Sequence, residues 1–312
     1  MYFPFLRGKQ FELIAIRELS DSLSSKRDKI SPIIEPVKDS FTTLRSTLEA
    51  LKSADVNFNL IVNPIVGDLT NNCDDIYDLI KDVLDDYTNF QIAFYVNDTK
   101  NIGESLRLAK KINFDFNGFS FIHTSQVPNL SDVKKFDGIK KTTYHIIDLS
   151  KTSRRYHRNF VGSRYISLEN HFLIQDRNSD YAITPDEFFS EEHLFYTADG
   201  FSGFSDYLTV GDSFSEAGFA PYAVAIHLTY PDKDNKIRIH HFVSNSNEDT
   251  TDVAGKFAEA LEKLVAWVNK NKFTSEAIEE FKELHRDGHF PGLGYVKKLS
   301  IKHHIELVLN LI

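Results

Sequence analysis

The sequence predicts an α/β protein, with a closed (β/α)8 barrel of the TIM type as the leading architecture. Two observations carry this prediction. Eight short apolar segments of strand length alternate with segments whose apolar residues recur at helical spacing. Several of these strands are apolar at consecutive positions, which is typical of parallel strands buried on both faces. Short connections favour parallel βαβ units, and eight strands enclose an interior that side chains just fill.

The expected elements follow one another through most of the chain. The strands are Tyr2–Leu6, Ile30–Val37, Asn59–Ile65, Phe90–Val96, Gly118–His123, Thr143–Leu149, Arg164–Leu168 and Phe204–Val210. Helices are expected at Gln10–Ser22, Phe41–Ala54, Ile76–Tyr87, Ile102–Ile112 and near Leu130–Phe136. An open doubly wound sheet is the competing fold. However, the sequence RGKQ after the first strand lacks the glycine-rich phosphate turn that is common there.

Two segments interrupt the alternation of strands and helices. The acidic connection 169–203 is long for a loop, so we expect a lid, a partner surface or an excursion with its own structure. After the eighth strand, the turn PDKDN separates two strand-like runs and predicts a β-hairpin over 223–244. Asp252–Asn269 would be the eighth barrel helix. The predicted domains are a barrel over 1–272, including both segments, and extra C-terminal helices over 273–312 that pack on it.

Composition and charge exclude several classes of protein. The 312 residues are 41% hydrophobic and 26% charged, as in ordinary globular proteins. The single cysteine, Cys73, excludes an internal disulfide framework, and a buried or capping role suits it better than that of a nucleophile. A net charge of −9 argues against broad contact with nucleic acid. Without a signal peptide or a membrane-length apolar run, we expect a cytoplasmic protein that does not enter the membrane.

Polar residues at the strand ends are the candidate site. In a barrel, the carboxyl ends of the strands meet on one face, where catalytic groups lie. Glu35, Asp148 and Asp206 are the candidate catalytic carboxylates. The candidate ligand-binding residues are Arg7, Lys9, Lys38, Asn63, Asn97, His123 and Asp212. Capping of the helices that follow is the alternative role for about half of the polar strand-end residues.

Glu35 is unusual among them because it lies inside an apolar strand. A carboxylate there must be paired, protonated or bound to a ligand. An ion pair with Arg7 or Lys38 and a catalytic role explain it equally well. The catalytic interpretation is a barrel enzyme for a phosphorylated or nucleotide-like ligand, with a divalent metal on oxygen ligands. It requires a common cavity for Arg7, Glu35, Asn63, Asp148 and Asp206.

No complete catalytic motif accompanies these residues. The chain lacks a G-x-S-x-G elbow, a P-loop lysine and an H-E-x-x-H metal motif, so its reaction, cofactor and metal are left undetermined. The glycine-rich segment 287–298 either cradles an anion or connects two helices. A C-terminal basic stripe offers a local contact for nucleic acid, although a solvated helix face explains it better. The stripe comprises Lys297, Lys298, Lys302, His303 and His304.

The opening YFPFLRGKQFE (residues 2–12) and the strand PIIEPV (32–37) resemble an uncharacterised bacterial family named only after a locus tag. The runs DYLTVGD (206–212), AIHLTY (225–230) and GHFPGLG (288–294) match the same pattern. The chain is more distantly similar to the Beta protein family of phage and bacterial genomes. Such families look like accessory genes of mobile elements and defence islands. The resemblance therefore implies a role in phage–host conflict with a protein partner encoded nearby, and it supplies no catalytic residue.

Overall fold

The structure, a computed structural model, describes residues 1–70, 72–127, 129–153, 155–160, 163–215 and 220–312. The chain divides into two compact units. Unit 1 comprises Met1–Glu169 and Phe195–Asp206, and unit 2 comprises Asn170–Leu194 and Tyr207–Ile312. This division differs from the boundary expected at residue 272, because residues 170–194 fold with the part of the chain that follows residue 206.

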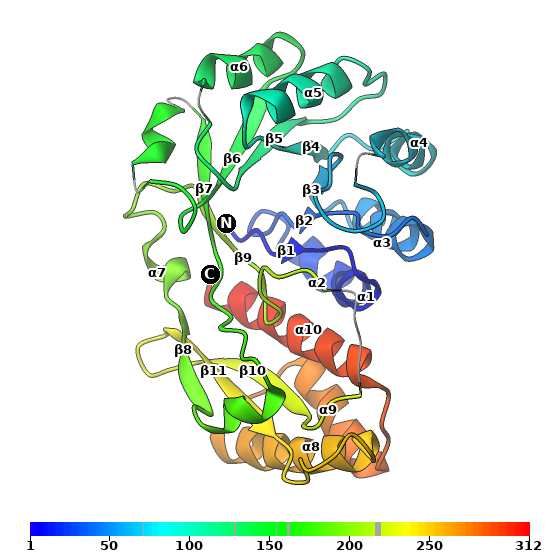
Figure 1. Cartoon of the computed structure of the whole chain (residues 1–312), viewed down its shortest axis with the longest axis vertical. Coiled ribbons are helices and arrows are strands. Elements are labelled where there is room, and N and C mark those ends of the chain that lie inside the picture. The colour runs from blue at the N-terminus through cyan, green and yellow to red at the C-terminus, as the bar shows by residue number, and fades with distance from the viewer. Residues whose placement is uncertain (71, 128, 154, 161–162, 216–219) are drawn as a thin grey trace. The chain divides into compact units, whose positions relative to one another are not determined.

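Unit 1 is a (β/α)8 barrel, which confirms the predicted fold class (Figure 1). Eight parallel strands neighbour one another in chain order: β1 (Phe5–Leu6), β2 (Ile33–Ile34), β3 (Phe58–Ile61), β4 (Phe90–Tyr95), β5 (Gly118–His123), β6 (Thr142–Asp148), β7 (Arg164–Glu169) and β9 (Gly203–Asp206). The helices between them are α1 (Gln10–Glu18), α2 (Ser20–Ser25), α3 (Thr42–Ser53), α4 (Cys73–Val83), α5 (Thr99–Ala109) and α6 (Leu130–Lys134). Two 3-10 helices, η1 (Lys135–Gly138) and η2 (Tyr156–Asn159), flank β6.

The chain start closes the barrel. Tyr2 forms parallel bridges with Ile30 on one side and with Phe204 on the other. The Phe3 N–H donates to the Phe204 oxygen at 2.8 Å, and the Phe204 N–H donates to the Met1 oxygen at 3.1 Å. The first and last strands of the barrel are therefore hydrogen-bonded neighbours.

Side chains along each strand alternate between the barrel interior and the surrounding helices. Phe94, Phe119 and Phe121 all contact Phe136 of η1, so their positions face the helices. Directly paired residues on neighbouring strands point to the same side of the sheet, so the strand registers show which positions of the other strands face the helices. Positions one residue further along, such as Ser120, face the interior.

The eighth barrel strand is shorter than predicted. The sequence predicts a strand over 204–210, but β9 ends at Asp206. Leu208 has a φ of 55°, which no strand accommodates, and the Gly211 N–H donates to the Tyr207 oxygen at 3.1 Å. Tyr207, Leu208 and Thr209 of this run are thus buried in a turn and not in a strand.

Unit 2 contains a three-stranded antiparallel sheet in the order β10, β11, β8. The predicted hairpin is confirmed as β10 (Ala225–Pro231) and β11 (Ile237–Val243). The third strand, β8 (Asp186–Ser190), comes from the acidic connection, which also forms the 3-10 helix η3 (Asn178–Ala182). The short helix α7 (Glu192–Phe195) follows β8. The acidic connection therefore has a structure of its own.

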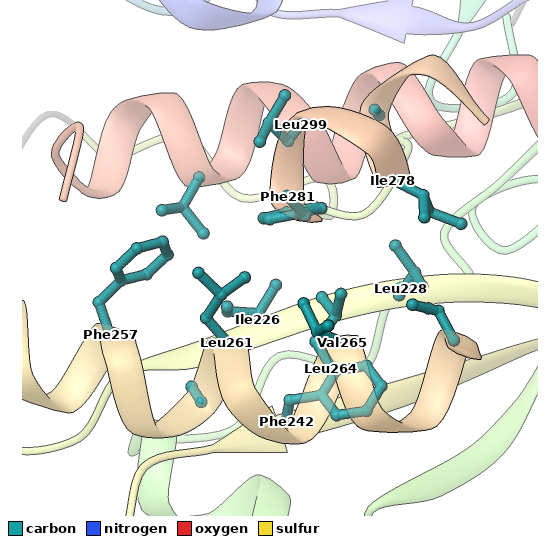
Figure 2. Packing of buried hydrophobic residues seen from close by; sticks show 14 of the residues in the cluster. Ile226, Leu228, Phe242, Phe257, Leu261, Leu264, Val265, Ile278, Phe281 and Leu299 are labelled. Atoms are coloured by element: carbon teal, nitrogen blue, oxygen red, sulfur yellow. The ribbon is translucent and has the colours of Figure 1, made fainter. Parts of the chain in front are cut away.

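Three helices, α8 (Val253–Asn271), α9 (Glu276–Asp287) and α10 (Leu293–Leu311), complete unit 2. Figure 2 shows the apolar side of α8 facing side chains from β10, β11, α9 and α10. The helix predicted to be the eighth of the barrel thus belongs to the core of unit 2. This core includes Ile226, Leu228, Phe242, Phe257, Leu261, Leu264, Ile278, Phe281 and Leu299.

Gly203 lies at the closure of the barrel, where a side chain has no room. A Cβ atom there would approach the Met1 oxygen to 2.6 Å and a ring carbon of Phe3 to 2.7 Å. We expect Gly203→Ala to lower the free energy of unfolding by about 1–3 kcal/mol, measured by urea denaturation. Gly138→Ala is the control, because nothing lies within 4 Å of its Cβ position. Equal effects of the two substitutions would contradict this account of closure.

Candidate functional site

A buried ion pair lies at the carboxyl ends of β1 and β2. The Arg7 Nη1 atom is 2.5 Å from Glu35 Oε2, and the two side chains are 10% and 0% exposed. The ion pair predicted for Glu35 is therefore confirmed, with Arg7 as its partner. Both residues follow strand positions that face the helices, so alternation directs their side chains towards the barrel interior.

Further hydrogen bonds hold this pair in place. The Tyr95 hydroxyl at the end of β4 donates to Glu35 Oε2 at 2.9 Å, and the Ile65 N–H donates to Oε1 at 3.0 Å. The Arg7 N–H donates to the carboxylate of Glu12 in α1 at 2.5 Å. Both oxygens of Glu35 thus have donors, and the cluster joins β1, β2 and β4.

The two predicted asparagines bind the backbone of neighbouring strands. Asn63 Oδ1 accepts from the Tyr95 N–H at 2.9 Å, and its Nδ2 donates to the Tyr95 oxygen at 3.1 Å. Asn97 Oδ1 accepts from the N–H and the hydroxyl of Thr124 at 3.1 and 2.9 Å. Both side chains continue the pairing of strands beyond the ends of the ladders, and this use accounts for their place at the strand ends.

The predicted catalytic aspartates Asp148 and Asp206 have hydrogen-bond partners of their own. Asp148 accepts from the N–H and the hydroxyl of Ser150 at 3.0 and 2.6 Å, and it lies 3.1 Å from the Lys151 amine. Asp206 accepts from the Tyr2 hydroxyl at 2.9 Å, at a strand position that faces the helices. Asp206 therefore points towards the helices and away from the barrel interior.

The remaining predicted residues are also distributed. Lys9 precedes α1 and is partly exposed, and exposed Lys38 lies 3.4 Å from Asp68. Asp212 belongs to unit 2, where it accepts from Asn170 at 3.0 Å. No group of three or more His, Cys, Asp or Glu side chains in the described part of the chain is arranged to hold a metal ion.

His123 takes part in a buried cluster that the sequence does not reveal. Its Nε2 lies 2.9 Å from His145 Nδ1, and its Nδ1 lies 3.1 Å from the Tyr156 hydroxyl. The ring of Phe160 stacks on His145 at 4.0 Å. Burial lowers the pKa of His145 to about 3 and that of His123 well below its ordinary value. The cluster therefore contains neutral imidazoles that bind β5, β6 and η2 together.

A second histidine pair lies on the sheet of unit 2. His227 Nδ1 is 2.8 Å from His241 Nδ1, and His241 Nε2 is 3.0 Å from Glu187 of β8. The ring of Tyr181 lies 4.6 Å from both imidazoles. Burial lowers the pKa of both histidines. These contacts fasten β8 and η3 to the β10–β11 hairpin.

The expected basic stripe is not a charged surface. Only Lys297 is exposed, whereas Lys298, Lys302, His303 and His304 are at most 5% exposed. The amines of Lys298 and Lys302 lie 3.3 and 2.6 Å from the carboxylate of Glu280 in α9. The solvated helix face favoured for this stripe is therefore wrong, because α10 buries four of its five side chains, and only Lys297 is left for a local nucleic-acid contact. The glycine-rich segment before α10 connects it to α9, as one of the two interpretations expects.

Exposed apolar side chains gather in residues 170–194, which we call the insertion. Five of the nine large apolar side chains exposed in the described residues lie there. We call these five residues the insertion surface: Leu173 (57% exposed), Ile174 (51%), Ile183 (82%), Phe188 (49%) and Leu194 (41%). Ala182 and Pro185 of the insertion also line an open groove of about 510 Å³ together with His240, Phe242, Lys263 and Trp267.

Ion pairs and hydrogen bonds hold the insertion on the hairpin. Asp186 accepts from Arg238 Nε at 2.7 Å and from the Tyr230 hydroxyl at 2.5 Å. Glu191 lies 2.6 Å from the Lys236 amine. Sequence reasoning identified this segment as a lid, a partner surface or an excursion, but it did not single out the apolar residues among the acidic ones.

No protein-family model matches this chain, and no curated protein or solved structure matches it either. Among the described residues, no helix has both the length and the apolar character that crossing a membrane requires.

The Arg7–Glu35 pair makes a testable prediction about stability. Arg7→Met leaves a buried carboxylate without its cation, which should lower the free energy of unfolding by about 3–5 kcal/mol. Glu35→Gln should cost less, because a neutral amide oxygen still accepts from Ile65 or Tyr95. Urea denaturation at pH 7.5 measures both values. A smaller loss for Arg7→Met than for Glu35→Gln would contradict the structural role.

The His145 imidazole predicts a dependence of stability on pH. Its pKa of about 3 lies below the value of about 6.5 expected in the unfolded chain, so the unfolded state binds the proton more tightly. The stabilisation is complete above pH 6.5 and falls as the pH decreases from 6.5 towards 3. Between pH 7.5 and pH 5, His145 should account for a loss of about 2 kcal/mol.

The His145→Phe variant removes this contribution, because phenylalanine keeps an aromatic ring beside Phe160 and cannot be protonated; it also removes the contact with His123 Nε2, which lowers stability at both pH values. Over the same pH interval, the variant should lose about 2 kcal/mol less than the wild type. Urea denaturation at the two pH values provides the comparison. Equal losses for both proteins would show that His145 does not titrate in the way its burial implies.

Proposed function

We propose that this chain is a binding component of a bacterial phage-defence or mobile-element system. In this proposal it acts in the cytoplasm, through a protein partner encoded nearby. The single observation that carries the proposal is the insertion surface, with five exposed large apolar side chains in 25 consecutive residues. In this proposal the five side chains contribute to one contact surface, since a contiguous exposed apolar patch is typical of protein-interaction sites.

The scaffold under the insertion supports this proposal. The contacts of Asp186, Glu187 and Glu191 with the hairpin hold the segment in a defined conformation. A surface that is ordered before binding loses less conformational entropy when a partner docks. The insertion is therefore better suited to a specific partner than a mobile loop of the same composition would be.

Two further considerations favour binding over catalysis. The resemblance to families of mobile elements and defence islands motivates a role in phage–host conflict. The alternative, a barrel enzyme for a phosphorylated or nucleotide-like ligand, depends on convergence of five strand-end side chains. Asp206 accepts from Tyr2, at a register position that faces the helices, and Asp148 accepts from Ser150, so that alternative has less support than binding.

The experiment is co-purification with the product of the adjacent gene, expressed together with the tagged chain. We expect a stable complex with the wild type and at least about a tenfold loss of the partner with Ile183→Asp, because the charge is placed at the most exposed apolar position. Ile139→Asp is the matched control, since Ile139 is 38% exposed but lies in unit 1. Absence of any complex, or equal loss with both variants, would overturn the proposal.

A further inference from the structure

The strand β8 forms an open edge of the unit 2 sheet. In the sheet order β10, β11, β8, it pairs only with β11, in antiparallel register. An edge strand of this kind presents a row of N–H and C=O groups to which another extended chain can bind.

One hydrogen bond determines which groups point outward. The His241 N–H donates to the Pro185 oxygen at 2.8 Å. Hydrogen-bonded and non-hydrogen-bonded pairs alternate in an antiparallel ladder, so Glu187 also directs its backbone groups towards β11. The N–H and C=O groups of Asp186 and Phe188 then point away from β11. In the described part of the chain, no backbone hydrogen bond outside the β8–β11 ladder uses them.

The side chains of β8 make this edge suitable for docking. Phe188 is 49% exposed, whereas its neighbour Phe189 is 1% exposed and contacts His304. Asp186 and Phe188 share one face of the sheet, and Arg238 holds Asp186 in place. The strand contains neither proline nor lysine, so every outward residue keeps its N–H and no cation on the strand opposes a basic segment, although its carboxylates disfavour pairing with other chains. An added strand would therefore find the outward backbone groups of Asp186 and Phe188, with the Phe188 side chain as an apolar anchor.

The charge of unit 2 specifies the chemistry of the docking strand. Unit 2 contains 21 of the 45 acidic residues but only 13 of the 36 lysine and arginine residues. It therefore carries −8 of the net charge of −9. Six of its acidic residues lie in the insertion itself: Asp176, Asp180, Asp186, Glu187, Glu191 and Glu192. A basic segment is attracted to this unit, while a second copy of the chain is repelled.

We propose that β8 binds an extended basic segment of the protein partner as a fourth strand of the unit 2 sheet. The segment pairs its main chain with the outward groups of Asp186 and Phe188, and it alternates Lys or Arg with β-branched residues. This inference rests on the proposed function, since it names the chemistry of the partner at the same insertion.

The probe is a fluorescein-labelled nine-residue peptide of alternating Lys and Val, titrated with the full chain and followed by anisotropy. We expect saturable binding that weakens as salt is added, because the attraction between the charges is screened. A Glu–Val peptide of the same length should bind at least about tenfold more weakly. Two further Lys–Val peptides carry N-methyl groups at every second amide, one at the odd and one at the even positions. One of the two should bind at least about tenfold more weakly, because it loses the main-chain donors that pair with β8.

Variants of Phe188 test the same edge from the side of the protein. Phe188→Pro removes an outward N–H, and Phe188→Thr removes the apolar anchor but keeps the N–H. We expect both variants to weaken binding of the Lys–Val peptide, and Phe188→Pro to weaken it more. Ile139→Asp should leave binding of the peptide unchanged. If Phe188→Pro fails to fold, binding of the two methylated peptides to the wild type tests whether β8 pairs with their main chain. Binding that is indifferent to methylation in both phases and to Phe188→Thr overturns the inference.

The outcomes separate this inference from the proposed function. A partner that co-purifies while the Lys–Val peptide fails to bind leaves the function intact and removes the β8 assignment. If the peptide binds but no partner co-purifies, the proposed function is rejected. Light scattering coupled to gel filtration checks for a second copy at this edge. A dimer that Phe188→Pro abolishes would replace the basic partner by self-association and so overturn the inference.

Discussion

The pairing of Tyr2 with both Ile30 and Phe204 is the constraint on which unit 1 depends. It removes both free edges of the parallel sheet and brings the ends of β1, β2 and β4 around one interior, where Arg7, Glu35 and Tyr95 meet. The sheet of unit 2 has no such closure. The two units thus differ in kind: one has all its barrel strands paired within the chain, and the other keeps an edge to which a further strand can be added.

Much of the barrel could be predicted because burial on both faces leaves a continuous apolar run in the sequence. The sequence of a helix does not show which other elements its apolar side packs against. The apolar side of α8 would suit a barrel strand as well as it suits Ile226 and Phe242, so periodicity identified the helix but not its unit. The end of β9 was missed for a related reason, since an apolar turn at Leu208 has the same composition as a strand.

The candidate site could be predicted only where one residue conflicts with its surroundings. Glu35 is such a case, because a carboxylate in an apolar strand requires a cation. Tyr95 looks like an ordinary core residue in the sequence, and its hydroxyl contact depends on a strand two places away. The direction of Asp206 could not be predicted, because it follows from the register around the whole barrel. Lys298 and Lys302 seemed to form a surface stripe because Glu280, which neutralises them, lies on another helix.

The insertion between β7 and β9 also affects the order in which the chain can fold during synthesis. Unit 1 is discontinuous, so its last strand leaves the ribosome only after the whole insertion has emerged. At that moment β8 exists without β11, which is encoded further downstream. The barrel can thus close while its acidic insertion still lacks its sheet, and that segment stays unpaired until the hairpin is made. The high charge and short length of β8 are suited to this interval, because both disfavour premature aggregation.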